Sequence, residues 1–159
     1  MTRKTNAIRM LEAAGVNHEV REYDISIEEF SATAVADLIG LPAAQVFKTL
    51  VATGERSGPC FAVIPADTEL DLKALARTTG DRRMDLVPVK DVEPLTGYHR
   101  GGVTALGVRR EFPVYLDISA AEHDLIGVSG GVKGIQVLLT PDDYLALTGA
   151  HLEEIARHG

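Results

Sequence analysis

The pattern of apolar and polar positions predicts short helices and short strands that follow one another irregularly along the chain. Apolar residues at helical spacing, with glycines after them, favour helices over residues 6–14, 32–39, 72–79 and 89–95, and Pro141 begins a last helix. Apolar runs favour strands over residues 18–23, 46–52, 60–64, 84–87, 113–118, 125–129 and 135–139. The turn at residues 53–58 makes two of these strands a hairpin. We therefore predict an α+β fold, a single compact domain over residues 1–159 with a mixed, barrel-like sheet flanked by helices.

The composition is that of an ordinary globular protein. The chain has 159 residues, of which 45% are apolar and 25% are charged. No apolar run reaches the length of about 18 residues that a membrane span needs, and no apolar segment follows the basic residues 1–7. The lone Cys60 excludes an internal disulfide. We therefore expect a cytoplasmic protein without a signal peptide.

Charge is distributed unevenly along the chain. The net charge of −7 argues against a protein that coats DNA or other nucleic acid by bulk attraction. Residues 70–110 hold eight basic and five acidic residues, so this segment is +3 and the remainder is −10. A local basic surface on an acidic protein can still hold the end of a polyanion. The alternative is a set of solvated faces without a role in binding, which composition alone favours.

Two polar residues, Lys48 and Thr49, interrupt the apolar strand over residues 46–52 at its centre. A buried ammonium without partners is costly, so Lys48 must be paired, shifted in pKa or used by the protein. One alternative is an edge-strand lysine that blocks aggregation, and another is a stem that crosses apolar surface to reach water. The functional interpretation is a fixed cation for a phosphate, a carboxylate or a developing oxyanion. Thr49 either faces the other side of the strand or lies at a bulge.

The stretch GVSGG at residues 127–131 matches the G-x-S-x-G pattern of a nucleophile elbow, with Ser129 as the nucleophile. That elbow requires a helix after the serine, whereas here a glycine turn leads into a strand. The histidines that follow, His151 and His158, are expected near a mobile chain end. A hairpin with glycines at positive φ, or a turn in which Ser129 and backbone N–H groups line a pocket, is therefore favoured over a serine hydrolase.

The stretch TGYHRGGVTALG at residues 96–107 contains four glycines. It has neither the Gly-Lys-Ser/Thr of a P-loop nor the spacing of a dinucleotide-binding motif. So many glycines indicate that the backbone closely approaches something else, and a tight loop between packed elements is the simplest case. Elsewhere, the five histidines show no ligand spacing and Cys60 begins an apolar strand, so we predict no metal site and no cofactor.

Four motifs, in this order and at these spacings, resemble the YbaK/EbsC proteins: VFKTLVA at 46–52, DLKAL at 71–75, GYHRGGVTALG at 97–107 and VSGGVKG at 128–134. These proteins are free-standing relatives of the editing domain inserted in bacterial prolyl-tRNA synthetase. The likeness runs from about Tyr23 to the last helix. It implies a compact α+β domain with a barrel-like sheet that removes a wrong amino acid from tRNA in trans. One branch of the family clears Cys from Cys-tRNA(Pro), and others clear Ala or different small amino acids.

The resemblance also implies which residues form the site. Lys48 corresponds to the family's active-site lysine, and Gly101 and Gly102 to the glycines of its GYxxGG loop, so these three are the catalytic candidates. The substrate-binding candidates are Tyr23, Phe30, Thr49, Ser129, Gly130 and Gly131. The family loop usually continues with Ser-Pro, whereas this chain has Thr104-Ala105, which frees φ at Ala105 and restores an N–H. That departure puts the substrate preference in question more than the fold.

The implied mechanism uses no protein nucleophile. Lys48 would hold a phosphate or ester oxygen at the 3′ terminus of an aminoacylated tRNA, and the Gly101-Gly102 backbone would orient the ester carbonyl and the ribose. A Cys ester would be attacked by its own thiol, whereas an Ala ester would need a positioned water. The basic segment would meet the acceptor stem, with prolyl-tRNA synthetase as a candidate partner that helps to hold the tRNA. The alternative is a non-catalytic module on the same fold that binds a nucleotide or an aminoacyl ester.

Overall fold

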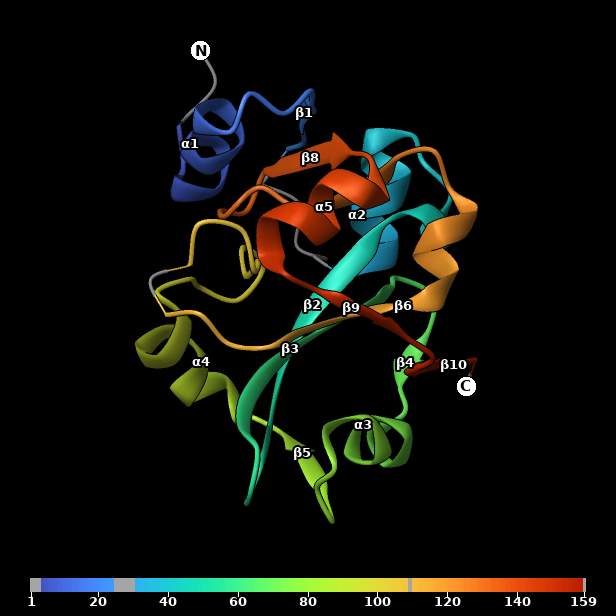
Figure 1. Cartoon of the computed structure of the whole chain (residues 1–159). Helices are drawn as coiled ribbons and strands as arrows, with labels where there is room; N and C mark the ends of the chain where they lie inside the picture. Colours follow the sequence, from blue (N-terminus) through green and yellow to red (C-terminus); the bar gives the residue numbers. More distant parts are fainter. Residues whose placement is uncertain (1–3, 25–30, 109, 159) are drawn as a thin grey trace.

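The largest sheet of the protein has five strands in the spatial order β5-β2-β3-β6-β9 (Figure 1). In the computed structural model, which describes residues 4–24, 31–108 and 110–158, these strands are β2 (Phe47–Gly54), β3 (Gly58–Pro65), β5 (Met84–Leu86), β6 (Val114–Asp117) and β9 (His151–Glu153). β2 pairs antiparallel with β3 and with β5, whereas β6 runs parallel to β3 and β9 runs parallel to β6. The predicted hairpin and the predicted mixed sheet are therefore confirmed.

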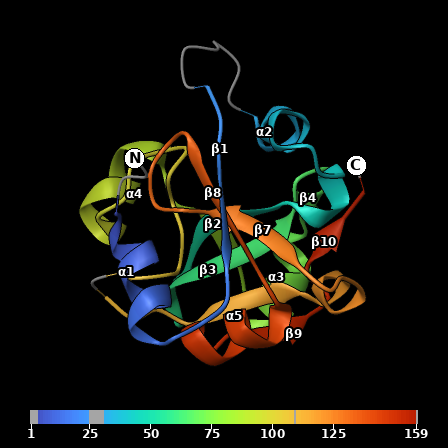
Figure 2. The same cartoon turned by 90° about the horizontal axis from the view of Figure 1, so that it is seen from above.

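A second sheet, with three antiparallel strands in the order β1-β8-β7, lies over β2 and β3 when the molecule is seen from above (Figure 2). Its strands are β1 (Glu19–Glu22), β7 (Ile126–Ser129) and β8 (Ile135–Leu139), and a small third sheet pairs β4 (Glu69–Leu70) with β10 (Ala156–Arg157). An isolated parallel bridge between Val46 and Gly127 joins the start of β2 to β7. Because the two larger sheets meet at this bridge and enclose the main core, the strands form a barrel-like arrangement.

Helices cover the outside of the sheets. The α-helices of the described residues are α1 (Asn6–Ala13), α2 (Ala32–Ile39), α3 (Leu72–Thr79), α4 (Val89–Thr96) and α5 (Pro141–Thr148), and two 3-10 helices span Ala43–Gln45 and Ile118–Glu122. Ser31 and Asp71 cap α2 and α3 with their side chains. Gly40 and Gly80 end the same two helices in the left-handed conformation. Local residues thus determine both ends of these helices.

The main core lies between the two larger sheets. It takes Phe47 and Val51 from one face of β2, Val137 and Leu139 from β8, and Leu11 from α1. The opposite face of β2 contributes to a second core that contains residues of α3. α3 and β5 lie at the end of the molecule away from α1 and β1 (Figure 1). β2 runs from the middle of the molecule to the tip that carries β5 (Figure 1).

The sequence does not predict three of the short strands, β4, β9 and β10. Each has two or three residues and includes a charged one, so neither an apolar run nor an alternating pattern marks it. The expected mobile end at His151 is wrong, because His151 is paired with Tyr115 between β9 and β6 and the two rings lie together. Within the described ranges, no helix combines the length and the apolar character that a bilayer span requires.

Candidate active site

Lys48 lies near the start of β2, opposite Ile64 of β3. Its Nζ donates a hydrogen bond to the backbone oxygen of Ala66 at 3.3 Å. Burial of this half-buried side chain lowers the pKa of Lys48, and the nearby carboxylates of Asp67 and Glu69 oppose that effect. At Lys48, β3 pairs with one side of β2, whereas β5 pairs with the other side only from Ala52 onward. In the part of the chain that the structure describes, Lys48 therefore lies on a locally unpaired edge, and the edge-strand explanation still applies.

The edge of β2 that faces away from β3 is open around Lys48. Val46 bridges to β7, and pairing with β5 begins at Ala52, so among the described residues no strand is paired with this edge at residues 48–50. We call these three residues the β2 seam. The backbone oxygen of Val51 accepts from the N–H of Val87 at 2.9 Å, on the side away from β3. Since peptide groups alternate in direction along a strand, the backbone groups of Thr49 point into the seam.

The Thr49 side chain lies on the face of β2 opposite to that of Lys48, because adjacent strand residues face opposite sides. Its Oγ1 is buried and has no hydrogen-bond partner in the described part of the protein. A buried hydroxyl without a partner is uncommon, because its desolvation is not offset. β2 pairs with β3 without interruption, so the bulge alternative is wrong. The prediction that the Lys48 and Thr49 side chains face opposite sides of the strand is confirmed.

Two glycine-rich segments lie against each other near the end of β7. A Cβ on Gly102 would lie 2.8 Å from the Cα of Val132, and a Cβ on Gly101 would lie 2.7 Å from both Cγ and Cε of Lys133. Real Cβ atoms do not make such short contacts, so Gly102 must be glycine while the two backbones stay this close, whereas at Gly101 the Lys133 side chain would have to move. Gly101 also has a φ of +89°. The close backbone approach that the glycine content predicts is therefore confirmed, and its partner is the turn at residues 130–134.

The loop at residues 97–107 is held by its own hydrogen bonds. The Tyr98 hydroxyl donates to the backbone oxygen of Leu106 at 2.7 Å, across the loop. The N–H of Tyr98 is bonded to the Thr96 side chain, and the N–H of Leu106 to that of Thr104. Ala105, which stands where the family usually has proline, is buried in the main core. Packing and hydrogen bonds therefore hold this loop without a proline.

Ser129 ends β7 and begins the turn at residues 130–134. Its Oγ accepts the N–H of Gly131 at 3.2 Å, and Gly131 has a φ of +99°. β8 follows the turn, so the helix of a nucleophile elbow is absent and the hairpin interpretation is confirmed. A hydroxyl that accepts an N–H keeps its own proton for another acceptor. Ser129 is thus able to donate a hydrogen bond to a ligand.

Tyr23 connects the glycine turn to the surroundings of Lys48. Its N–H donates to the backbone oxygen of Gly134 at 2.9 Å. Its ring packs against a cluster that contains Val46 and Ala66, and Ala66 is the residue whose oxygen accepts from Lys48. Tyr23 therefore links the turn at residues 130–134 to the cluster that contains Ala66, and the backbone oxygen of Ala66 accepts the hydrogen bond from Lys48. Phe30 lies outside the described residues.

Sequence reasoning missed Gln136, which pairs with Ser129 across β7 and β8. Gln136 is only 6% exposed, and its Oε1 is buried without a hydrogen-bond partner among the described residues. This oxygen would lie 3.9 Å from a Cβ on Gly127, whose other near neighbours are side-chain atoms of Leu41 and Val46. The signal was present in the sequence, because Gln136 interrupts an apolar strand just as Lys48 does.

Residues 28–147 match the family described as the aminoacyl-tRNA editing domain. The chain belongs to this editing family. A relative from Enterococcus faecalis (strain ATCC 700802 / V583), named "Putative Cys-tRNA(Pro)/Cys-tRNA(Cys) deacylase EbsC", is 41% identical over 152 residues, which are 96% of this chain and 93% of the relative. A solved structure described as "a putative trans-editing enzyme for prolyl tRNA synthetase" has a TM-score of 0.85 at 28% identity, covering 98% of this chain and 99% of that one. The structure of hypothetical protein APE2540 has a TM-score of 0.87 at 20% identity, which shows the fold alone; the likeness covers 96% of this chain and 100% of that one.

Membership of the editing family confirms the resemblance carried by the four motifs, and the protein is an aminoacyl-tRNA deacylase. Its candidate site offers the half-buried ammonium of Lys48, the hydroxyl of Ser129 and the backbone groups of the turn at residues 130–134. Cys60 is buried and burial raises its pKa to about 11, so it supplies no thiolate and is a core residue, as predicted. In the described part of the chain, no cluster of three or more His, Cys, Asp or Glu is arranged to hold a metal ion.

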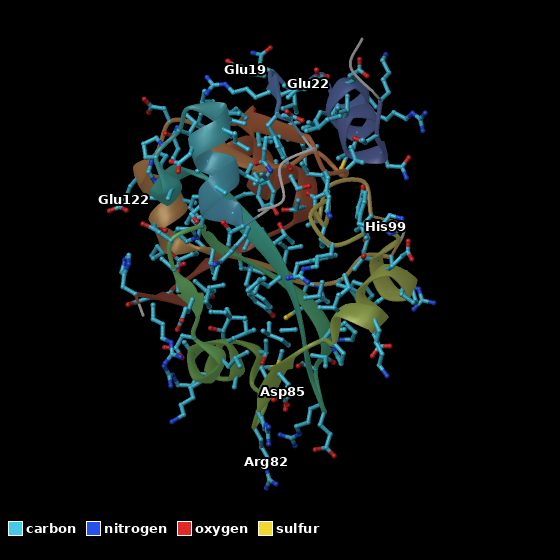
Figure 3. All side chains as sticks on the ribbon, turned by 180° about the vertical axis from the view of Figure 1, so that it is seen from behind. Glu19, Glu22, Arg82, Asp85, His99 and Glu122 are labelled. Carbon is cyan, nitrogen blue, oxygen red and sulfur yellow. The ribbon has the colours of Figure 1, made fainter. Side chains whose placement is uncertain are left out.

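The basic segment of this editing-family protein is divided in space. Arg82 lies at the tip of the molecule together with Asp85, well away from His99 (Figure 3). Arg83 is ion-paired with Asp85 at the same tip. Arg100, by contrast, lies in the glycine loop next to Gly101. The part of the segment around Arg82 and the part around His99 therefore lie apart on the molecule.

Proposed function

We propose that this protein clears cysteine from Cys-tRNA(Pro) in trans. The observation that carries the proposal is Lys48, a half-buried cation at the β2 seam that donates to the backbone oxygen of Ala66. Tyr23 packs against the cluster that contains Ala66, and its backbone is bonded to the turn at residues 130–134. Such a site supplies charge and orientation, which suits a substrate that carries its own nucleophile. The name of the Enterococcus faecalis relative supports the same substrate.

In the proposed reaction, the thiol of the cysteinyl ester attacks its own carbonyl carbon. The new carbon–sulfur bond closes a thiolactone, the carbon–oxygen bond to the 3′-terminal ribose breaks, and the ribose oxygen takes the thiol proton. Lys48 holds a terminal phosphate or stabilises the ester oxygen, and the peptide groups of Gly101 and Gly102 orient the carbonyl. The protein thus provides orientation and electrostatic stabilisation rather than a covalent intermediate.

The amino-acid pocket of the proposal lies between the seam and the glycine turn. Its described residues are Tyr23, Thr49, Ser129, Gly130 and Gly131. The Ser129 hydroxyl has a proton to donate to an ester or ribose oxygen. The Gln136 Oε1, an acceptor without a partner among the described residues, suits the substrate ammonium. These two groups would distinguish a bound aminoacyl ester from a free acyl group.

The proposal includes a partner and a location. An acidic protein, with a net charge of −7, does not hold a whole tRNA by bulk attraction. Prolyl-tRNA synthetase would retain the tRNA body, while this protein receives the aminoacylated 3′ end near Arg100. The description of one solved neighbour as a trans-editing enzyme for that synthetase supports this arrangement. Because the substrate is made and used in the cytoplasm, the proposal places the protein there.

A deacylation time course tests the proposal. Purified protein is presented with Cys-tRNA(Pro), Ala-tRNA(Pro) and Pro-tRNA(Pro), in parallel with the Lys48→Ala variant. We expect rapid loss of Cys, slower or no loss of Ala, no loss of Pro, and no enzymatic release in the variant. The products from Cys-tRNA(Pro) are analysed for thiolactone, which a water-based mechanism would not form.

Other outcomes of the same experiment would replace the proposal. Preferential loss of Ala would assign the protein to an Ala-tRNA(Pro) branch with a positioned water. Tight binding of the esters without release from any of them would instead favour a non-catalytic module on this fold. Labelling of Ser129 by a fluorophosphonate probe would indicate a serine nucleophile, which the turn geometry argues against.

A further inference from the structure

Thr5, the residue before α1, contacts the turn at residues 130–134 of the candidate site. Its hydroxyl donates to the backbone oxygen of Gly130 at 2.5 Å. The same Oγ1 accepts the N–H of Ile8 at 3.1 Å, so Thr5 is also the N-cap of α1. One hydroxyl therefore joins the first turn of a helix to the turn that follows Ser129.

The two hydrogen bonds of Thr5 depend on each other. A threonine hydroxyl has one proton, and Thr5 uses it on Gly130, while its acceptor capacity serves Ile8. The chain from Ile8 N–H through the hydroxyl to the Gly130 carbonyl is therefore continuous, and such chains polarise their members. A residue that only caps the helix would need an oxygen to accept the Ile8 N–H, and would not need a proton to donate to Gly130.

The peptide between Gly130 and Gly131 is held on both sides. Its oxygen accepts from Thr5, and its N–H donates to the Ser129 Oγ at 3.2 Å. A Cβ on Gly131 would lie 3.2 Å from the Cβ of Thr5 and 3.1 Å from Cε1 of Tyr98. Rotation of this peptide would break the Thr5 bond and release the Ser129 hydroxyl from its fixed direction.

The first turn of α1 also contacts the second glycine segment. A Cβ on Gly107, which ends the loop at residues 97–107, would lie 2.5 Å from the backbone oxygen of Asn6. The N–H of Gly107 is directed at the sulfur of Met10 at 3.1 Å. α1 lies beside this yellow loop when the molecule is seen from above (Figure 2). One helix end thus contacts both glycine segments of the candidate site.

We propose that Thr5 is a positioning residue for deacylation, which orients the Gly130–Gly131 peptide and, through it, the Ser129 hydroxyl. This inference rests on the proposed function, because it assigns Thr5 a part in the same reaction. Thr5 does not touch the substrate. It couples the packing of α1 to the geometry of the turn, so that the turn presents one arrangement to the aminoacyl ester.

Three substitutions separate the two roles of the hydroxyl. Thr5→Ser keeps both the cap and the donor, Thr5→Asp keeps the cap but cannot donate to a carbonyl, and Thr5→Val removes both. We expect Thr5→Asp to lower the melting temperature modestly, because its carboxylate repels the Gly130 carbonyl, and to lower kcat for Cys-tRNA(Pro) per folded molecule about tenfold, with KM changed less. Thr5→Ser should restore turnover. Thr140→Asp, the same change at the N-cap of α5, is the matched control, because Thr140 caps its helix through Asp143 alone.

A second measurement does not depend on deacylation. The amide resonances of Gly130 and Gly131 report the orientation of the turn, and we expect them to shift in Thr5→Asp but not in Thr5→Ser or Thr140→Asp. If Thr5→Asp keeps both wild-type kcat and wild-type resonances, Thr5 is a helix cap only and the inference is overturned. If the wild-type protein releases no amino acid, the proposed function fails, and the amide shifts alone decide whether Thr5 orients the turn.

Discussion

The hairpin tip at the end of β2 and the candidate site use the same device, a glycine that makes room for a neighbour, but they differ in how their polar groups are satisfied. At the hairpin tip, a Cβ on Gly54 would overlap the carboxylate of Asp81. That carboxylate accepts from the backbone N–H groups of Arg56, Ser57 and Arg82 and from the Ser57 hydroxyl, all at 2.8–2.9 Å. The Ser57 backbone hydrogen bond is the largest cause that lowers the pKa of Asp81 to about 2. This end is complete without a ligand.

In the candidate site, glycines again allow close approach, but two buried polar atoms have no hydrogen-bond partner among the described residues. Gly101 and Gly102 admit Lys133 and Val132, while the Thr49 Oγ1 and the Gln136 Oε1 have no partner in the described part of the chain. A buried polar atom left unsatisfied costs about 1–3 kcal/mol. The difference indicates that the polar groups of the hairpin tip stabilise the fold, whereas Thr49 and Gln136 keep polar atoms that a ligand would satisfy.

The largest expected effect removes the cation at the seam. Lys48→Met keeps the length of the stem and deletes the charge, so kcat/KM for deacylation should fall at least about 100-fold. The melting temperature should be unchanged or higher, because a partly desolvated charge is lost. Steady-state kinetics and a thermal scan measure the two effects. Arg82→Met, at the opposite tip, is the control and should retain turnover; a Lys48→Met protein with near-normal turnover would contradict the site.

Close packing of the glycine segments should give the next largest effect. Gly102→Ala places a Cβ 2.8 Å from the Cα of Val132, so the two segments must separate. We expect a loss of about 1–3 kcal/mol in the free energy of unfolding and a fall in kcat of about tenfold or more. Gly15→Ala is the control, since Gly15 has a φ of +67° and open space around it. That variant should lose stability and keep its turnover per folded molecule.

The charge state of Lys48 gives a pH dependence. Burial holds the pKa of Lys48 below its ordinary value, so the ammonium is lost as pH rises through that lowered pKa. The kcat/KM profile, corrected for spontaneous ester hydrolysis, should therefore fall on its alkaline side. Lys48→Arg stays charged over the same range. If Lys48→Arg keeps the alkaline fall while remaining active, another group causes it.

At the hairpin tip, the expected effect is on stability alone. Asp81→Asn loses the ionised acceptor, so the melting temperature should drop by several degrees while turnover per folded molecule stays the same. In the folded protein the pKa of Asp81 lies below its ordinary value of 3.8. The ionised carboxylate therefore stabilises the fold above pH 3.8, and this stabilisation is lost as the pH falls toward about 2. Acid unfolding of the two proteins should therefore converge near pH 2. If the wild-type protein and Asp81→Asn are equally stable at pH values above 3.8, the Asp81 carboxylate does not stabilise the hairpin tip.

The sequence predicts what local residues determine. Ser31 and Gly40 define both ends of α2, and the glycine content of residues 96–107 predicts a close approach. The bridge between Val46 and Gly127, which creates the seam, joins distant parts of the chain and has no local signal. The role of Thr5 is hidden for the same reason: its sequence context predicts at most a helix cap, and its second partner, Gly130, is far along the chain.

The smallest expected effect is also the one that tests the comparison between the hairpin tip and the candidate site most directly. Gln136→Met replaces an amide by an apolar side chain of similar length, which removes the buried Oε1 that has no partner among the described residues. If this oxygen serves the fold, the variant loses stability. If it is kept for the substrate, the free energy of unfolding rises by up to about 1 kcal/mol, because an unsatisfied acceptor is gone, while KM for Cys-tRNA(Pro) rises several-fold. Denaturant titration and steady-state kinetics on one preparation measure both quantities. A gain in stability together with a higher KM would mean that β8 carries a destabilising residue, Gln136, because the ligand needs it. At the hairpin tip, by contrast, the polar groups around Asp81 stabilise the fold.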